Sequence, residues 1–165
     1  MALSIIVYLS WLCISVFYAM KKPYTKLENS ALIFCLFLID LNRGWITNDE
    51  LKYATYSTAP LNYTGYILYR TFIAPFLLLI GINCIPRNSS ALKKVIASLI
   101  SSFVLVLINI ILLKFDVVDF HQWNLLYVFV NYVLLHLIGY FILYCYKSLV
   151  LKGETNKWFG LGILI

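Results

Sequence analysis

The residues of this sequence that could do chemistry are polar side chains set inside long apolar stretches. The candidate site comprises Asp40, Arg43, Arg70, Asn109, Asn131 and His136. Each of these side chains is costly in hydrocarbon, so each should have a polar partner or a function. On helices that rise about 1.5 Å per residue, the asparagines and arginines fall in one half of the membrane, and the other two residues fall near its midplane. The sequence therefore predicts one polar cluster built from four helices.

Two interpretations of this cluster remain open. In the preferred, structural one, Asp40 pairs with Arg43, three residues along the same helical face, or with Arg70 on the next helix. Asn109 and Asn131 would then form hydrogen bonds between helices and set their register. In the functional one, Asp40, Arg70 and His136 line a small hydrated cavity and handle a proton or a small charged solute. His136 can titrate near neutral pH, but the neighbouring tyrosines 132 and 140 could equally bond a structural imidazole.

The sequence has no motif of a known class of enzyme or cofactor site. The cysteines 13, 35, 84 and 145 each stand alone in an apolar stretch, without a C-x-x-C pair, and are expected to be buried, inert thiols. Serine hydrolase, zinc protease and phosphate-loop patterns are absent. We therefore expect a non-enzymatic protein without metal or cofactor.

The composition indicates whether these residues belong to a soluble protein or to a membrane protein. Hydrophobic residues make up 62% of the 165 residues and charged residues 12%, against roughly 45–50% and 25% in soluble domains. Residues 2–20, 95–113 and 124–146 contain no Asp, Glu, Lys or Arg, and each stretch is long enough to cross about 30 Å of hydrocarbon. This composition excludes soluble, disordered and disulfide-framework proteins. It also argues against nucleic acid as a partner, despite the net charge of +6.

The predicted fold is an all-α polytopic transmembrane bundle that forms a single integral membrane domain, residues 1–165. Its five predicted spans are residues 2–20, 27–44, 62–85, 95–113 and 123–146. The second span must include Asp40 and Arg43, and the third includes Arg70 and the kink-prone Pro75.

The segments between and beyond these spans are short. Residues 45–61 form the longest connection, with a short surface helix predicted over residues 48–54 and capped by Asn48. Tyr63, Tyr66 and Tyr69, at the start of the third span, are expected to belong to an aromatic belt at the interface. Residues 147–165 form a tail whose apolar end, from Trp158, is expected to lie in the interface.

The basic residues predict the orientation of the chain. Nine of the thirteen lie in the connection after the first span, in the connection after the third span and in the tail. The opposite side has five of the seven acidic residues. Since Lys and Arg are retained in the cytoplasm, the N-terminus and the loop 45–61 should be outside and the C-terminus cytoplasmic.

Residues 70–151 resemble a group of uncharacterised five-span integral membrane proteins of spore-forming Firmicutes. The likeness lies in the string FIAPFLLLIGINCIP (residues 72–86), the short basic turn that follows it, and the string HQWN (residues 121–124) that opens the last long helix. This resemblance implies a multi-pass protein of a bacterial plasma membrane, and it implies no activity.

Two functions follow from these expectations. The first is a non-enzymatic subunit or accessory factor, because the exposed segments are too short to act alone. Its partners would be the lipid bilayer and another membrane protein or a second copy of the chain. The alternative is a small transporter or sensor built around the polar cluster.

Overall fold

Five helices in the structure are long and apolar enough to cross a membrane. They are Ala2–Ala19, Lys26–Glu50, Pro60–Asn83, Ala91–Lys114 and Leu125–Leu149. The structure, a computed structural model, describes the backbone of residues 1–161 and the side chains of residues 1–149. It confirms the prediction of an all-α bundle with five membrane-length helices. The predicted interfacial placement of Trp158 lies outside the described side chains.

Three of these helices are uninterrupted, and two change their winding along their length. In chain order the elements are α1 (Ala2–Ala19), α2 (Lys26–Gly44), η1 (Trp45–Glu50), β1 (Ala54–Tyr56), α3 (Pro60–Leu68), η2 (Tyr69–Ile73), α4 (Ala74–Asn83), α5 (Ala91–Lys114), β2 (Val118–Phe120) and α6 (Leu125–Leu161). The segments η1 and η2 are π-helical turns. The helix α6 continues beyond residue 146, where the last span was predicted to end.

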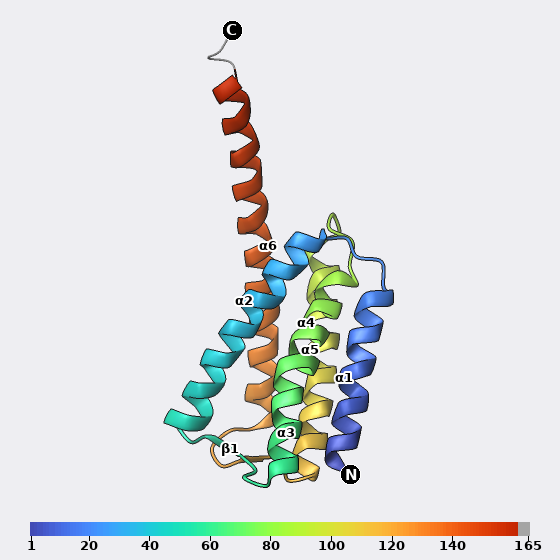
Figure 1. Cartoon of the computed structure of the whole chain (residues 1–165), viewed down its shortest axis with the longest axis vertical. Coiled ribbons are helices and arrows are strands. Elements are labelled where there is room, and N and C mark those ends of the chain that lie inside the picture. Colours follow the sequence, from blue (N-terminus) through green and yellow to red (C-terminus); the bar gives the residue numbers. More distant parts are fainter. Residues whose placement is uncertain (162–165) are drawn as a thin grey trace.

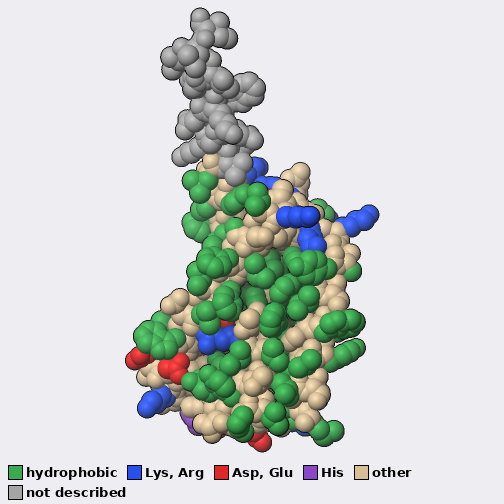
Figure 2. All heavy atoms as spheres, in the orientation of Figure 1, with side chains coloured by type: hydrophobic (Ala, Val, Ile, Leu, Met, Phe, Trp, Pro, Cys, Tyr) green, Lys and Arg blue, Asp and Glu red, His purple; other side chains and the backbone are tan. Residues whose placement is uncertain are grey.

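The two ends of the bundle differ in the chain segments that lie there (Figure 1). The N-terminus and the β-strands lie at one end, here called the ribbon end. The α1–α2 and α4–α5 connections lie at the other, here called the basic end, and α6 extends beyond it (Figure 1). On the face drawn in Figure 2, most of the basic side chains gather at the basic end, and acidic side chains lie at the ribbon end. Hydrophobic side chains cover much of the surface between the two ends (Figure 2).

The local sequence explains where α2 begins. The Thr25 hydroxyl accepts a hydrogen bond from the Glu28 amide at 3.2 Å, and the Glu28 carboxylate accepts one from the Thr25 amide at 2.9 Å. This capping box satisfies two amides that the first turn would otherwise leave free. The helix therefore begins directly after the α1–α2 connection.

The π segment η2 arises where a proline disturbs the regular α-helix. At η2 the amide of Ala74 bonds to the carbonyl of Tyr69, five residues back. The next residue, Pro75, has no amide, and its ring would press on the preceding turn of a regular helix. The predicted kink at Pro75 thus takes the form of a wider turn just before it.

The prediction of a surface helix over residues 48–54 is wrong. The helix that starts as α2 runs on as η1 to Glu50, and the chain then turns at Lys52, whose φ is 52°. The Tyr53 amide bonds back to the Thr47 carbonyl at 3.0 Å. From Ala54 the chain is extended, so that this connection can pair with another strand.

The β-strands form a two-stranded antiparallel ribbon, which the sequence did not predict. Its register pairs Ala54 with Phe120 and Tyr56 with Val118. The carbonyl of Tyr53 accepts the amides of residues 121, 122 and 123 at 2.9–3.2 Å. Two connections far apart in the sequence are thereby joined across the ribbon end.

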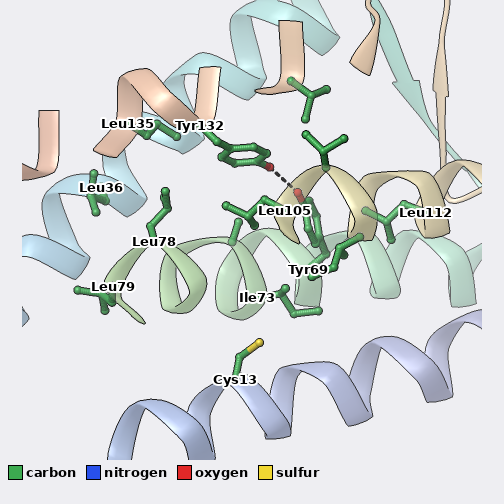
Figure 3. Close-up of a cluster of buried hydrophobic side chains, with 14 of the residues drawn as sticks. Cys13, Leu36, Tyr69, Ile73, Leu78, Leu79, Leu105, Leu112, Tyr132 and Leu135 are labelled. Atoms are coloured by element: carbon green, nitrogen blue, oxygen red, sulfur yellow. Dashed lines mark hydrogen bonds between the residues drawn. The ribbon is translucent and has the colours of Figure 1, made fainter. Parts of the chain in front are cut away.

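The interior is filled by apolar side chains from all five long helices (Figure 3). Cys13 points into this interior from α1, and Leu105 and Leu112 come from α5 (Figure 3). Among the cysteines only Cys13 is buried, whereas Cys84 is exposed and the other two are half-buried. The prediction of buried thiols is therefore right for Cys13 and wrong for Cys84.

Candidate functional site

A polar cavity of about 50 Å³ lies beneath the ribbon. The helices α2, α5 and α6 and the segments η1 and η2 contribute to its walls, and Ala54, Val118 and Phe120 of the two strands cover it. This volume holds a few water molecules or one small ion, because a single water needs only about 10–15 Å³ by this measure. We call it the capped cavity. It is lined by five of the six predicted site residues, namely Asp40, Arg43, Arg70, Asn109 and Asn131.

The carboxylate of Asp40 binds both arginines. Arg43 Nη2 lies 2.7 Å and Nε 3.1 Å from Oδ1, while Arg70 Nε lies 3.6 Å from Oδ2. Only 9% of the Asp40 side chain is exposed, against 28% for Arg43 and 16% for Arg70. The two pairings that the sequence left as alternatives therefore occur together.

Arg70 also binds the backbone of α2. Its Nη2 donates to the carbonyls of Asp40 at 2.7 Å and Leu41 at 2.5 Å, and its Nη1 donates to the Tyr66 hydroxyl at 3.4 Å. The guanidinium can come this close because Gly44 has no side chain. A Cβ atom at Gly44 would overlap the guanidinium.

This contact joins one π segment, η2, to the part of α2 that precedes the other, η1. Arg70 belongs to η2, and the carbonyls that it binds lie in the last turn of α2, just before η1 begins. π turns inside α-helices recur at functional sites. Gly44 and Pro75 are the two sequence signals that could have marked this place.

A second, neutral network forms the deeper wall of the capped cavity. Asn109 donates to the Tyr69 hydroxyl at 2.6 Å and to the Leu105 carbonyl at 2.8 Å. The Tyr69 hydroxyl bonds in turn to that of Tyr132 on α6 (Figure 3). Asn131 lines the cavity without a side-chain hydrogen bond to another residue of the described part. This amide is therefore available to a molecule in the cavity.

The sequence missed the tyrosines of this site. Tyr66 and Tyr69 were expected in an interfacial belt, but they are buried and line the capped cavity. Tyr63 is 41% exposed and is the one member of the series that stays at the surface. Spacing by three residues could not separate them, because successive members of such a series turn progressively around the helix.

The ribbon is tied to the helices beneath it by polar and aromatic contacts. Asn48 donates to the Tyr66 hydroxyl at 2.7 Å, and the ring of Tyr56 stacks on that of Tyr66 with centroids 5.2 Å apart. The Tyr56 hydroxyl donates to Asp49 at 2.9 Å, and this hydrogen bond raises the pKa of Tyr56. The ribbon that covers the cavity therefore packs directly on α3 through Tyr56 and Tyr66.

His136 lies outside the capped cavity. It is fully buried one turn deeper on α6, where its Nδ1 is 2.8 Å from the Tyr132 carbonyl and 3.4 Å from the Ser102 hydroxyl. A carbonyl only accepts, so Nδ1 carries the proton and cannot act as a base toward Ser102. The expected side-chain partners at positions 132 and 140 are replaced by a backbone carbonyl. The structure therefore does not bring His136 together with Asp40 and Arg70, which the functional interpretation had grouped with it.

The capped cavity has an excess of positive charge. Its charged lining residues are Arg43, Arg70 and Asp40, which gives two cations and one anion. Within the described residues, no group of three or more His, Cys, Asp and Glu side chains could hold a metal ion. The chemistry available is thus recognition of an anion by guanidinium, amide and hydroxyl donors.

Comparison of the chain with protein-family models, with curated proteins and with solved structures finds no match. The functional argument therefore starts from the geometry of the capped cavity.

Proposed function

We propose that this protein is a non-enzymatic multi-pass membrane protein that binds a small anion in the capped cavity, as a sensor or a carrier. The observation that carries the proposal is the pair of guanidiniums that share a single carboxylate in the wall of the capped cavity. An uncompensated charge in the apolar part of a membrane protein is costly, and a bound anion would neutralise it. The free amide of Asn131 adds a neutral donor.

The size of the cavity restricts the ligand. About 50 Å³ admits an ion of the size of chloride or nitrate and is too small for drug-sized organic substrates, whose sites commonly span about 300–1,000 Å³. We place the ribbon end outside the cell, in a bacterial plasma membrane, because the opposite end has the excess of basic residues. The ligand would then come from the external medium.

Thermal unfolding of the purified protein tests this proposal. The melting temperature should be higher in sodium chloride or nitrate than in sodium gluconate at the same ionic strength. A ligand at 100 times its dissociation constant stabilises the folded state by about 2.7 kcal/mol, which raises the melting temperature by several degrees. Arg43→Gln should remove this dependence on the anion, because it leaves one cation and one carboxylate in the cavity.

Arg87→Gln is the matched control. It also removes an arginine that pairs with a carboxylate, Glu28, but at the basic end. It should keep the full anion effect. If the unaltered protein melts at the same temperature in all three salts, the polar cluster only holds the helices together. Anion flux into proteoliposomes would distinguish a carrier from a sensor.

A different observation favours the accessory-subunit function. An apolar groove of about 420 Å³ runs between α4 and α5, and the small residue Ala97 forms part of its lining. Gly81 and Ser101 also line it, but they already pack against each other. Small residues let a neighbouring transmembrane helix approach closely. We propose a helix of a partner membrane protein as the occupant of this groove. Ala97→Leu should then release the protein from a larger complex in native membrane extracts, whereas Ala31→Leu on α2 should not.

A further inference from the structure

Another cavity, separate from the capped cavity, lies at the basic end, where α1 and α2 diverge. The two helices lie on opposite sides of the α3–α4 helix (Figure 1). Between them is a cavity of about 730 Å³, here called the hairpin pocket. Its apolar lining includes Phe17, Ile33, Phe76 and Leu79. The edge-to-face contact between Phe17 and Phe76, with centroids 5.4 Å apart, fixes part of its wall.

Two lysines line the same pocket. The ammonium of Lys22 lies 4.6 Å from the ring centroid of Phe17 and 5.4 Å from that of Tyr18, which holds it at the pocket. Lys26 is the first residue of α2, so its charge adds to the positive end of that helix. Neither lysine pairs with a carboxylate of the described residues.

The surroundings leave this charge available to a ligand. The nearest acidic residue along the chain, Glu28, is already occupied by the Thr25 amide at 2.9 Å and by Arg87 at 3.0 Å. The hairpin pocket therefore combines an apolar interior with two cations that have no carboxylate partner among the described residues. On the face drawn in Figure 2, hydrophobic surface lies directly below the basic side chains of this end.

We propose that the hairpin pocket binds one anionic phospholipid, with its phosphate held by Lys22 and Lys26 and an acyl chain between α1 and α2. The pairing of cations with an apolar interior favours a lipid over a free phosphate ion, since the latter would use only the lysines. Basic pockets between transmembrane helices bind lipid headgroups in this way. The site is separate from the capped cavity and does not depend on the function proposed for it.

Lipid retention in native mass spectrometry tests the assignment. The full-length protein is taken from nanodiscs that contain phosphatidylglycerol and phosphatidylcholine in equal amounts. The unaltered protein should retain one phosphatidylglycerol in preference to phosphatidylcholine. Lys22→Gln with Lys26→Gln should lower the affinity for phosphatidylglycerol about 30-fold, the effect expected of two lysine contacts with a lipid surface.

Two further variants make the result specific. Lys93→Gln with Lys94→Gln removes the same charge from the same end and should leave retention unchanged. Ile33→Trp keeps both lysines of the hairpin pocket but fills its apolar part, and it should also weaken retention. If both double-lysine variants lose phosphatidylglycerol retention equally, the lipid is held by general attraction to the basic surface, and the proposal is overturned. Competition by inorganic phosphate alone, or full retention in Ile33→Trp, would equally overturn it by showing a phosphate site without an acyl chain.

Discussion

The capped cavity and the hairpin pocket each have two basic side chains, and the two sites differ in how those charges are compensated. Arg43 and Arg70 share the carboxylate of Asp40, and Arg70 also binds two carbonyls of α2. Lys22 and Lys26 have no carboxylate partner among the described residues. Deep in the apolar body a charge must find its partner within the protein, whereas at the end of a bundle water and lipid headgroups can serve.

The largest expected effect concerns the two ends of the bundle, which we propose lie on opposite sides of the membrane. In a background without native cysteines, Thr58→Cys should react with a membrane-impermeant thiol reagent in intact cells. Asn88→Cys, at the basic end, should react only after permeabilisation, because basic connections are retained in the cytoplasm. The reverse pattern would invert the orientation and move the proposed anion site to the cytoplasmic side.

The second largest effect is expected when the Asp40 carboxylate, which both arginines share, is removed. Asp40→Asn leaves two cations in the apolar body and should lower the free energy of unfolding by about 3–5 kcal/mol, seen as a lower yield and melting temperature. Adding Arg43→Gln should recover much of this loss, since Arg70 keeps its backbone carbonyls. Adding Arg70→Gln should recover less. Equal recovery by the two arginine changes would show that the carbonyl contacts contribute little.

A smaller effect is expected at the close approach of α2 and η2. Gly44→Ala would displace the Arg70 guanidinium from its partners and should cost about 1–3 kcal/mol, as overpacking of a tight contact does. Gly65→Ala is the control, because there the new methyl meets only the tip of Ile6. Denaturation of both variants in the same detergent gives the comparison. A smaller loss for Gly44→Ala than for Gly65→Ala would contradict the proposed role of Gly44.

The smallest effect is expected at the basic end. The ion pair between Arg87 and Glu28 spans 3.0 Å, and the Arg87 side chain is 37% exposed. The Glu28 side chain is only 5% exposed, but without Arg87 its carboxylate keeps the hydrogen bond from the Thr25 amide at the start of α2. Arg87→Gln should therefore lower the free energy of unfolding by only about 1 kcal/mol. A loss of free energy of unfolding as large as that of Asp40→Asn would show that ion pairing matters as much at the basic end as in the capped cavity.

The candidate site could be predicted in part from depth along the helices. Depth placed Arg70, Asn109 and Asn131 in one half of the membrane and Asp40 near its midplane, and all four line the capped cavity. It failed for His136, which is one turn deeper than Tyr132 and packs beside Gly81 and Ser102. Depth gives the position of a side chain along the membrane normal. The rotation of each helix, which decides what that side chain faces, depends on packing against the other helices.

The sequence by itself determined which stretches become long apolar helices and where the charges lie along them. These properties follow from local composition, because the backbone of an apolar stretch in lipid must satisfy its own hydrogen bonds as helix. Only the tertiary structure decided that Arg70 of η2 binds the end of α2, and that strands centred on Thr55 and Asp119 pair over the cavity. Strands of three residues have too little local preference to form alone. They pair here because the packed helices bring the two connections together at the same end of the bundle.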